Sequence, residues 1–339
     1  MRAAVFASLL LAAAPALAGA PTQSALHPTG VQAEHIGWLW NLTLAICGGV
    51  FVAVVAAFLL ALRRAPKDGA GQAPDVSSLA QPERRIHRTV SWAVGACIVL
   101  LLVLLGADVL TSRALARLPL RNAVNIELVG HQWWWEARYQ FADPSLNFTT
   151  ANELHIPVGR PVVISLRSTD VIHSLWIPNL HGKRDLIPGR TALLHLRADR
   201  PGIYRGQCAE FCGLQHAKMA LEVMAEPDAQ YQTWAARQRQ PAAEPREALA
   251  LRGREVFLGG TCLMCHTVNG TIAQGKLGPD LTHLGSRRTI AAGMLPNNRG
   301  FLSGWIADPH ALKEGVNMPA NLLPPDDLQA LAAYLESLQ

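Results

Sequence analysis

Long apolar stretches dominate the first third of the sequence. Residues 1–20 have one arginine, a short apolar core and a tail of small residues, a pattern typical of a secretory signal peptide. An uncleaved membrane anchor is the alternative interpretation. Residues 38–62 and 91–110 are each apolar over roughly the 20 residues that a transmembrane helix requires. The pattern predicts a signal peptide over 1–20 and a transmembrane helical hairpin over 21–112.

The loop between the two spans predicts their orientation. It contains a cluster of basic side chains, and short loops rich in Lys and Arg stay on the cytoplasmic side of a membrane. Both ends of the hairpin, and everything after residue 112, are then expected on the outer side. A signal peptide would send the N-terminus to that same side. The cluster consists of Arg63, Arg64, Lys67, Arg84, Arg85 and Arg88.

Short alternating runs replace the apolar stretches between residues 120 and 226. Turns that contain Gly and Pro separate these runs. Short strands at such spacing predict an all-β sandwich or barrel, which we assign to residues 113–236. Residues 237–246 are rich in Gln, Arg, Ala and Pro, which is typical of a linker. The runs with a period of two cover residues 123–139, 152–168, 191–198 and 219–227.

Composition and charge add little beyond the membrane prediction. Half of the 339 residues are hydrophobic and only 16% are charged, which is apolar for a soluble protein. The formal net charge is +5, but the basic residues gather beside the membrane spans. The charge therefore gives no reason to expect a nucleic-acid partner.

A short motif near the C-terminus predicts a covalently bound haem. Residues 262–266 read CLMCH, the C-x-x-C-H signature in which Cys262 and Cys265 bind the haem vinyl groups and His266 is the proximal iron ligand. Electron-transfer haems of this kind take a methionine as the sixth ligand. Met318 is the expected ligand, and Met294 is the alternative.

The region over residues 247–339 resembles a small class I cytochrome c. It carries the haem motif, Gly/Pro turns in GKLGPDLTHLG, and a final amphipathic segment over 326–339. The resemblance implies an all-α domain. His283 could contact a haem propionate or lie at the surface. Cys47 and Cys97, by contrast, lie inside the two spans and are predicted to be small packing residues.

A second cluster of soft ligands lies in GQCAEFCGLQHAKM, residues 206–219. Cys208, Cys212, His216 and Met219 lie within twelve positions of one another. A disulfide is the default in an oxidising compartment, and a zinc knuckle is a further alternative. Copper electron-transfer sites use two histidines, a thiolate and a weak methionine, and His173 offers the second histidine. Two thiolates point to two metal ions.

The motifs DVIHSLWIPNLHGKRDLIPGR and YRGQCAEFCGLQHAKMALEV resemble subunit II of the haem–copper oxidases. The similarity extends to the preceding hairpin and to GHQWWWEARY, so it covers nearly all of residues 30–236. It implies a cupredoxin-like sandwich that carries a dinuclear copper centre, CuA. A disulfide would leave the two histidines and the methionine without a reason to sit where they do.

The resemblance also implies roles for individual residues. In the family, electrons enter near an aromatic cluster, which corresponds here to Trp133, Trp134 and Trp135. The Glu210 carboxylate corresponds to a ligand of Mg²⁺ at the contact with subunit I. The implied copper ligands are His173, Cys208, the Glu210 carbonyl, Cys212, His216 and Met219.

These features predict an electron-transfer subunit of a proton-translocating cytochrome c oxidase in a bacterial inner membrane. Electrons from an external donor, such as a cytochrome c, would pass through haem c and CuA to subunit I, where dioxygen is reduced. Subunits I and III and membrane lipid are the expected partners. The alternative is a nitric oxide reductase that uses a CuA subunit. A copper carrier would have no use for CLMCH, and quinol oxidases lack the six copper ligands.

One position departs from the family pattern. Many members have a glutamate just before the second span that helps to bring protons into subunit I, and here Thr89 lies near that place. Glu83 and His87 are the nearby titratable residues that could substitute for it.

Overall fold

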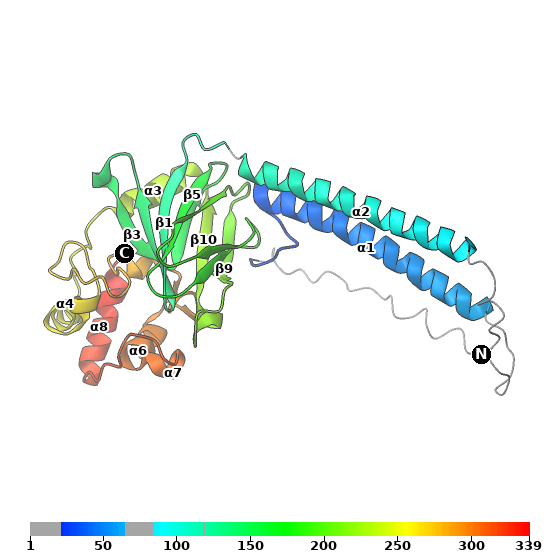
Figure 1. Cartoon of the computed structure of the whole chain (residues 1–339). Helices are drawn as coiled ribbons and strands as arrows, with labels where there is room; N and C mark the ends of the chain where they lie inside the picture. The colour runs from blue at the N-terminus through cyan, green and yellow to red at the C-terminus, as the bar shows by residue number, and fades with distance from the viewer. Residues whose placement is uncertain (1–21, 65–83, 118) are drawn as a thin grey trace, which may run out of the picture.

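Two long helices extend from one end of a β-sandwich, and a small helical domain packs against the sandwich (Figure 1). The computed structural model describes residues 22–64, 84–117 and 119–339. Helices α1 (Val31–Arg64) and α2 (Arg84–Ala116) run side by side, and both are long and apolar enough to cross a membrane. The predicted signal peptide lies outside the described residues, as do Lys67 and Glu83.

The two helices are longer than the apolar spans predicted from the sequence. Their 34 and 33 residues correspond to about 50 Å of helix each, whereas the hydrocarbon core of a membrane is about 30 Å thick. The first turn of α1 is buried, and Ala33 N donates to Leu180 O at 3.2 Å. The Gln32 side chain accepts from Arg197 N at 3.3 Å. The extra turns at this end therefore fasten α1 to the sandwich.

Ten strands form two five-stranded sheets that pack face to face, as the alternating runs predict. One sheet has the order β3-β2-β1-β5-β8 and the other the order β4-β10-β9-β6-β7. Side chains from both sheets, such as Leu128, Ile164, Leu175 and Leu221, are at most 1% exposed and form the core. Burying each such side chain contributes about 1.5–3 kcal/mol. The strands are β1 (Val124–His131), β2 (Trp134–Gln140), β3 (Phe148–Ala151), β4 (Glu153–Pro157), β5 (Val162–Ser168), β6 (His173–Trp176), β7 (Arg184–Leu186), β8 (Ala192–Leu196), β9 (Gly202–Cys208) and β10 (Ala220–Glu226).

The run predicted over residues 123–139 folds as a tight hairpin of two strands. Strand β1 ends at His131 and β2 begins at Trp134, and these two residues face each other in the antiparallel ladder. Gln132 and Trp133 therefore form the tip of the hairpin. Because a hairpin tip has no neighbouring strand, both residues are free to contact other parts of the chain.

Helix α3 (Asp228–Gln238) follows β10, the final strand of the sandwich, and reaches the start of the predicted linker. Its Trp234 stacks on His155 of β4, with ring centroids 4.1 Å apart. His155 also bonds to two carboxylates, Glu153 at 2.9 Å and Glu226 at 3.0 Å. Burial alone would lower the pKa of His155, but these two hydrogen bonds outweigh it and raise the pKa.

The C-terminal domain has its own hydrophobic core, in which Phe257, Leu331 and Tyr334 are each 1% exposed. Helix α8 (Pro325–Ser337) corresponds to the amphipathic segment predicted at the C-terminus, and it packs against helix α4 (Ala248–Gly259). Apart from two short strands in the described region, β11 (Thr289–Ile290) and β12 (Leu295–Pro296), the domain is helical. Its helices are α4 (Ala248–Gly259), α5 (Cys262–Cys265), α6 (Arg299–Ala307), α7 (Pro309–Leu312) and α8 (Pro325–Ser337).

Candidate functional site

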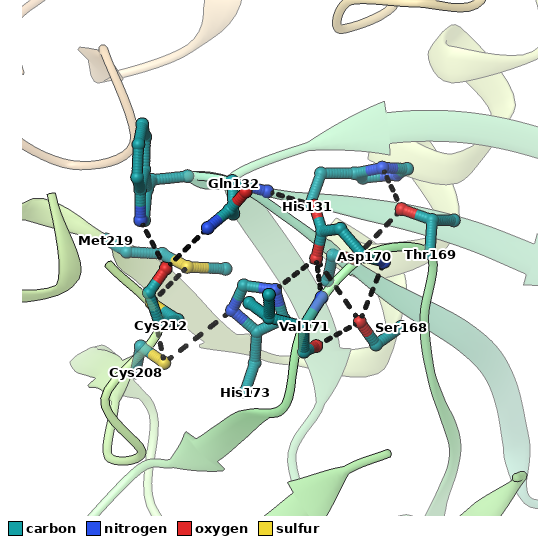
Figure 2. Close-up of polar contacts among 12 residues, drawn as sticks. His131, Gln132, Ser168, Thr169, Asp170, Val171, His173, Cys208, Cys212 and Met219 are labelled. Carbon is teal, nitrogen blue, oxygen red and sulfur yellow. Dashed lines mark hydrogen bonds and ion pairs between the residues drawn. The ribbon is translucent and has the colours of Figure 1, made fainter. Parts of the chain in front are cut away.

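One loop of the sandwich carries most of the soft ligand atoms. Strands β9 and β10 are antiparallel neighbours, and the loop between them runs from Cys208 to Met219. It is closed at its base by a hydrogen bond from Cys208 N to Met219 O, at 2.9 Å. His173, the first residue of β6, reaches the same point from the neighbouring strand. Figure 2 shows His173, Cys208, Cys212 and Met219 converging.

The donor atoms lie at separations that metal ions can bridge. Two donors bound to one tetrahedral metal, with bonds of about 2.0–2.3 Å, lie about 3.3–3.8 Å apart. Both cysteines are free and buried. The separations are 3.9 Å from His173 Nδ1 to Cys208 Sγ, 3.7 Å from Cys208 Sγ to Cys212 Sγ, 3.6 Å from Cys212 Sγ to His216 Nδ1, 3.9 Å from Cys212 Sγ to Met219 Sδ, and 3.2 Å from Cys208 Sγ to the Glu210 carbonyl oxygen.

The donor set fits copper better than zinc. Two thiolates and two imidazoles would satisfy a single tetrahedral zinc ion. Here a thioether and a backbone carbonyl face the same sulfur atoms, and soft thioether ligands select copper. Four donors face the two cysteine sulfurs, and the resulting six donor atoms are more than one tetrahedral ion can use.

His173 is held in the orientation that a metal ligand needs. Its Nε2 lies 2.8 Å from Asp170 Oδ1 (Figure 2), so the ring proton sits on Nε2 and Nδ1 is free to face Cys208. Burial alone would lower the pKa of His173, but the bond to Asp170 outweighs it and raises the pKa. Gly130 lies against the ring, where a Cβ atom would come within 2.8 Å of His173 Cδ2. Only glycine leaves the imidazole this space.

The two cysteine sulfurs are close enough to share a proton. Hydrogen bonding between them is the main reason why the pKa of Cys208 falls well below its usual range, and it outweighs the opposing effect of burial. The first proton of the pair is therefore released readily, and the same interaction raises the pKa of Cys212. A cation bound in place of the shared proton would offset the raised pKa of Cys212 and favour its thiolate form.

The tip of the β1–β2 hairpin contacts the loop from Cys208 to Met219, the candidate metal-binding loop. Trp133 Nε1 donates to Cys212 O at 2.9 Å, and Gln132 Nε2 donates to the same oxygen at 2.8 Å. Trp134 stacks on His131 with ring centroids 4.4 Å apart. Trp135 is fully buried in the sandwich core, 6.2 Å from the His173 ring. Successive strand residues point to opposite faces, so Trp134 and Trp135 lie on opposite faces of β2 and the predicted aromatic cluster is not a single stack.

The C-terminal domain and the sandwich enclose a cavity of about 570 Å³. Trp133 and Trp134 line it from the sandwich side. From the C-terminal domain, the lining includes four residues of the predicted haem site, Cys262, Cys265, His266 and Met318, but not Met294 among the described residues. The structure therefore brings the four residues together.

His266 is oriented much as His173 is. Its Nδ1 lies 2.8 Å from Pro279 O, so the ring proton sits there and Nε2 is free to bind iron. A Cβ atom on Gly278 would come within 2.6 Å of His266 Cε1, which makes glycine necessary beside the ring. His283, by contrast, is buried beside the linker, where its Nε2 donates to Gln240 O at 3.1 Å.

A buried arginine in the cavity wall is evidence that the cavity binds an acidic ligand, such as haem with its propionate groups. Arg287 is 8% exposed and lines the cavity, and its Nε has no hydrogen-bond partner among the described residues. An unpaired buried donor is costly unless a ligand satisfies it. Sequence reasoning missed this residue, because an Arg-Arg pair at positions 287–288 gives no periodic or spacing signal.

Two family profiles match separate parts of the chain: cytochrome c oxidase subunit II, periplasmic domain, over residues 144–226, and cytochrome c over residues 250–339. Cytochrome c oxidase subunit 2 of Alkalihalophilus pseudofirmus is 36% identical, and the match covers 95% of this chain and 92% of that protein. The chain belongs to the cytochrome c oxidase subunit 2 family.

Two further proteins are similar to this subunit 2 chain. Cytochrome c oxidase subunit 2 of Bacillus subtilis is 27% identical over 98% of this chain and 97% of the relative. The crystal structure of the periplasmic domain of subunit II of cytochrome oxidase of Bradyrhizobium japonicum is 27% identical, covers 36% of this chain and 97% of that chain, and has a TM-score of 0.33.

Family membership confirms the resemblance drawn from the motifs. The predicted fold class is also confirmed: two apolar helices, an all-β cupredoxin-like sandwich and an all-α cytochrome c domain. A subunit 2 sandwich implies CuA copper, and a cytochrome c domain implies haem. His173, Cys208 and Cys212 have ligand atoms within 4.8 Å of one another and could bind the metal.

Proposed function

We propose that this chain is the electron-transfer subunit of a respiratory cytochrome c oxidase, which passes electrons from an external donor to the catalytic subunit I. One observation carries the proposal. Trp133 forms part of the wall of the haem cavity, and its indole donates to the carbonyl of Cys212 in the metal-binding loop. The two cofactor sites thus share one side chain as their boundary.

The residues proposed to hold the cofactors are those that the motifs predict. Cys262, Cys265, His266 and Met318 would hold haem c. When bound, haem c and CuA would each take up and release single electrons, in the order haem, copper, subunit I. The CuA ligands would be His173, Cys208, the Glu210 carbonyl, Cys212, His216 and Met219.

The surroundings of the metal-binding loop suit electron transfer. Cys208, Cys212 and Met219 are at most 3% exposed, so water is excluded from their sulfur atoms. The bond from Asp170 holds His173, and the bonds from Gln132 and Trp133 hold the Cys212 carbonyl. Ligands that cannot move keep the same geometry in both redox states, which lowers the barrier to electron transfer.

The remaining proposals concern the membrane and the partner subunits. The basic residues at the ends of the two helices and in the loop that joins them support a location of the cofactor domains on the outer side of a bacterial inner membrane. The hairpin would pack against subunit I, and subunit III would complete the complex. Glu210 is proposed to bind Mg²⁺ at the contact with subunit I. Its carboxylate is partly exposed and lies 4.0 Å from Lys183 Nζ, so further ligands would have to come from subunit I.

Turnover of the complex purified through this chain tests the proposed function. Reduced cytochrome c would be supplied, with dioxygen and nitric oxide offered in separate assays. We expect rapid consumption of dioxygen. Reduction of nitric oxide without consumption of dioxygen would refute the oxidase assignment in favour of a nitric oxide reductase that uses the same ligands.

A further inference from the structure

A buried lysine joins the cytochrome c domain to the sandwich. Lys313 follows α7 and is 1% exposed. Its Nζ donates to three backbone carbonyls: Lys218 O at 2.8 Å, Ala291 O at 3.2 Å and Trp133 O at 3.3 Å. Two of these acceptors belong to the sandwich and one to the cytochrome c domain. An ammonium group has three donors, and here each has one acceptor.

This arrangement sets one relative position of the two domains. A buried ammonium group is tolerated only when its donors are satisfied. Burial lowers the pKa of Lys313 to about 8, so the charged form predominates at neutral pH. If the domains slid by about 1 Å, at least one bond would exceed the usual hydrogen-bond range. Any other docking position would therefore leave a buried donor or carbonyl unpaired.

Other side chains also bond across the boundary, each to the opposite domain only. Gln215 Nε2 donates to Glu314 O at 2.6 Å and Arg205 Nη1 donates to Gly293 O at 3.1 Å, and both bonds are partly buried. Other contacts are exposed and are weaker constraints. Lys218 Nζ donates to Leu312 O at 3.1 Å, and Asn317 Nδ2 donates to Gln132 O at 3.2 Å, both at the exposed surface. The ion pair between Arg288 and Glu222 is also exposed. Water competes with such contacts, and exposed pairs contribute about 0–1 kcal/mol. Lys313 is the fully buried member of this set.

We infer that Lys313 is a positioning residue that sets the register between the haem cavity and the metal-binding loop. It lines the cavity and bonds to the backbone of Trp133, whose indole in turn bonds to Cys212 O. The docking part of this inference stands on the described contacts alone. Its consequence for electron transfer rests on the proposed function.

Hydrogen exchange in the full-length chain, with haem attached and copper omitted, tests the docking. Ala220 N donates across the domain boundary to Ala292 O at 3.0 Å, so its exchange rate reports on docking. Val268 N donates to Ala273 O within the cytochrome c domain and reports on the stability of that domain. Lys313→Met keeps most of the length of the side chain and removes the charge. Arg288→Met removes an exposed positive charge at the same boundary and is the matched control.

We expect Lys313→Met to speed exchange at Ala220 by about tenfold or more, because charged hydrogen bonds are lost, while Val268 is unchanged. A tenfold change corresponds to about 1.4 kcal/mol. Arg288→Met should leave exchange at both amides close to its original rate. Unchanged exchange at Ala220 in Lys313→Met would overturn the inference, and so would an equal increase at both amides, which means unfolding rather than undocking.

The copper-loaded chain supplies a second readout that simple loss of stability would not produce. In Lys313→Met, we expect slower electron transfer from haem to copper and a lower haem midpoint potential, because a buried positive charge disappears from the cavity wall. Arg288→Met should leave the rate of electron transfer and the haem potential close to their original values. If the unaltered chain showed no electron transfer from haem to copper, the proposed function would fail, whereas the docking result would stand.

Discussion

Gly130 offers a sharp test of how the sandwich positions His173, a proposed copper ligand. In Gly130→Ala, the new Cβ atom would lie 2.8 Å from His173 Cδ2 and 3.1 Å from Cγ. The ring would have to retreat by at least about 0.6 Å to reach an ordinary contact of 3.4 Å. It cannot move freely, because Asp170 holds its Nε2 at 2.8 Å. The substitution therefore displaces a ligand without changing any ligand atom.

The expected loss of copper affinity follows from the cost of overpacking a core, which is about 1–3 kcal/mol. If most of that strain is relieved by displacing His173, copper affinity should fall by about tenfold to a hundredfold, since 1.4 kcal/mol is one factor of ten. Copper binding would be titrated in the full chain against a chelator of known affinity. Haem absorbance in the same sample would show whether the C-terminal domain remains intact.

Gly206→Ala is the matched control. Its Cβ atom would lie 2.8 Å from Leu221 Cδ2 and 3.0 Å from Ile177 Cγ1, so it overpacks the same sandwich without touching a ligand. We expect it to lower stability and to leave the copper affinity of the folded chain close to its original value. Equal copper affinity in Gly130→Ala and the unaltered chain would refute the idea that this close contact positions His173.

Three further predictions address the other residues. Cys212→Ser should abolish the mixed-valence copper signal and leave the haem spectrum intact, whereas Cys47→Ser should change neither; a surviving signal would contradict the CuA assignment. Met318→Ala should leave the haem attached but lower its potential, measured by redox titration, and an unchanged potential would mean another axial ligand. The pKa of His155 is raised in the folded state, so the protonated imidazole stabilises the fold. This contribution should be fully present below the unfolded pKa, about 6.5, and should be lost as the pH rises through the folded pKa. Urea unfolding at several pH values would show this, and His155→Gln should remove that part of the pH dependence.

The relation between the two cofactor domains differs from what a linker composition suggests. The sequence between them indicates a short linker, whose benefit would be a high effective concentration of one site near the other. In the structure α3 covers the start of that segment, and Lys313 and Ala292 bond across the boundary. The domains are docked in one position. Composition describes the linker alone and gives no information about surfaces that meet through residues far apart in the sequence.

Sequence reasoning reached furthest where chemistry is encoded over a few residues. The spacing of Cys208, Cys212, His216 and Met219 places four proposed donors on one loop, and CLMCH places both cysteines of the haem motif on one helical turn. The long apolar spans and the alternating strands are equally local patterns, so they predicted the hairpin and the sandwich. Such features depend on covalent geometry and periodicity, which the chain carries whatever it packs against.

Tertiary structure alone decided what lies between the two sites. Trp133 is 79 residues from Cys212 and Lys313 is 180 residues from Trp133, yet each pair is joined by a hydrogen bond. The hairpin turn at Gln132 and Trp133 interrupts a run that looks continuous in sequence. Arg287 and Lys313 became recognisable only through their burial and their bonding. The first contact arises from the folding of the sandwich and the second from its packing against the cytochrome c domain, and no local spacing in the sequence records either of them.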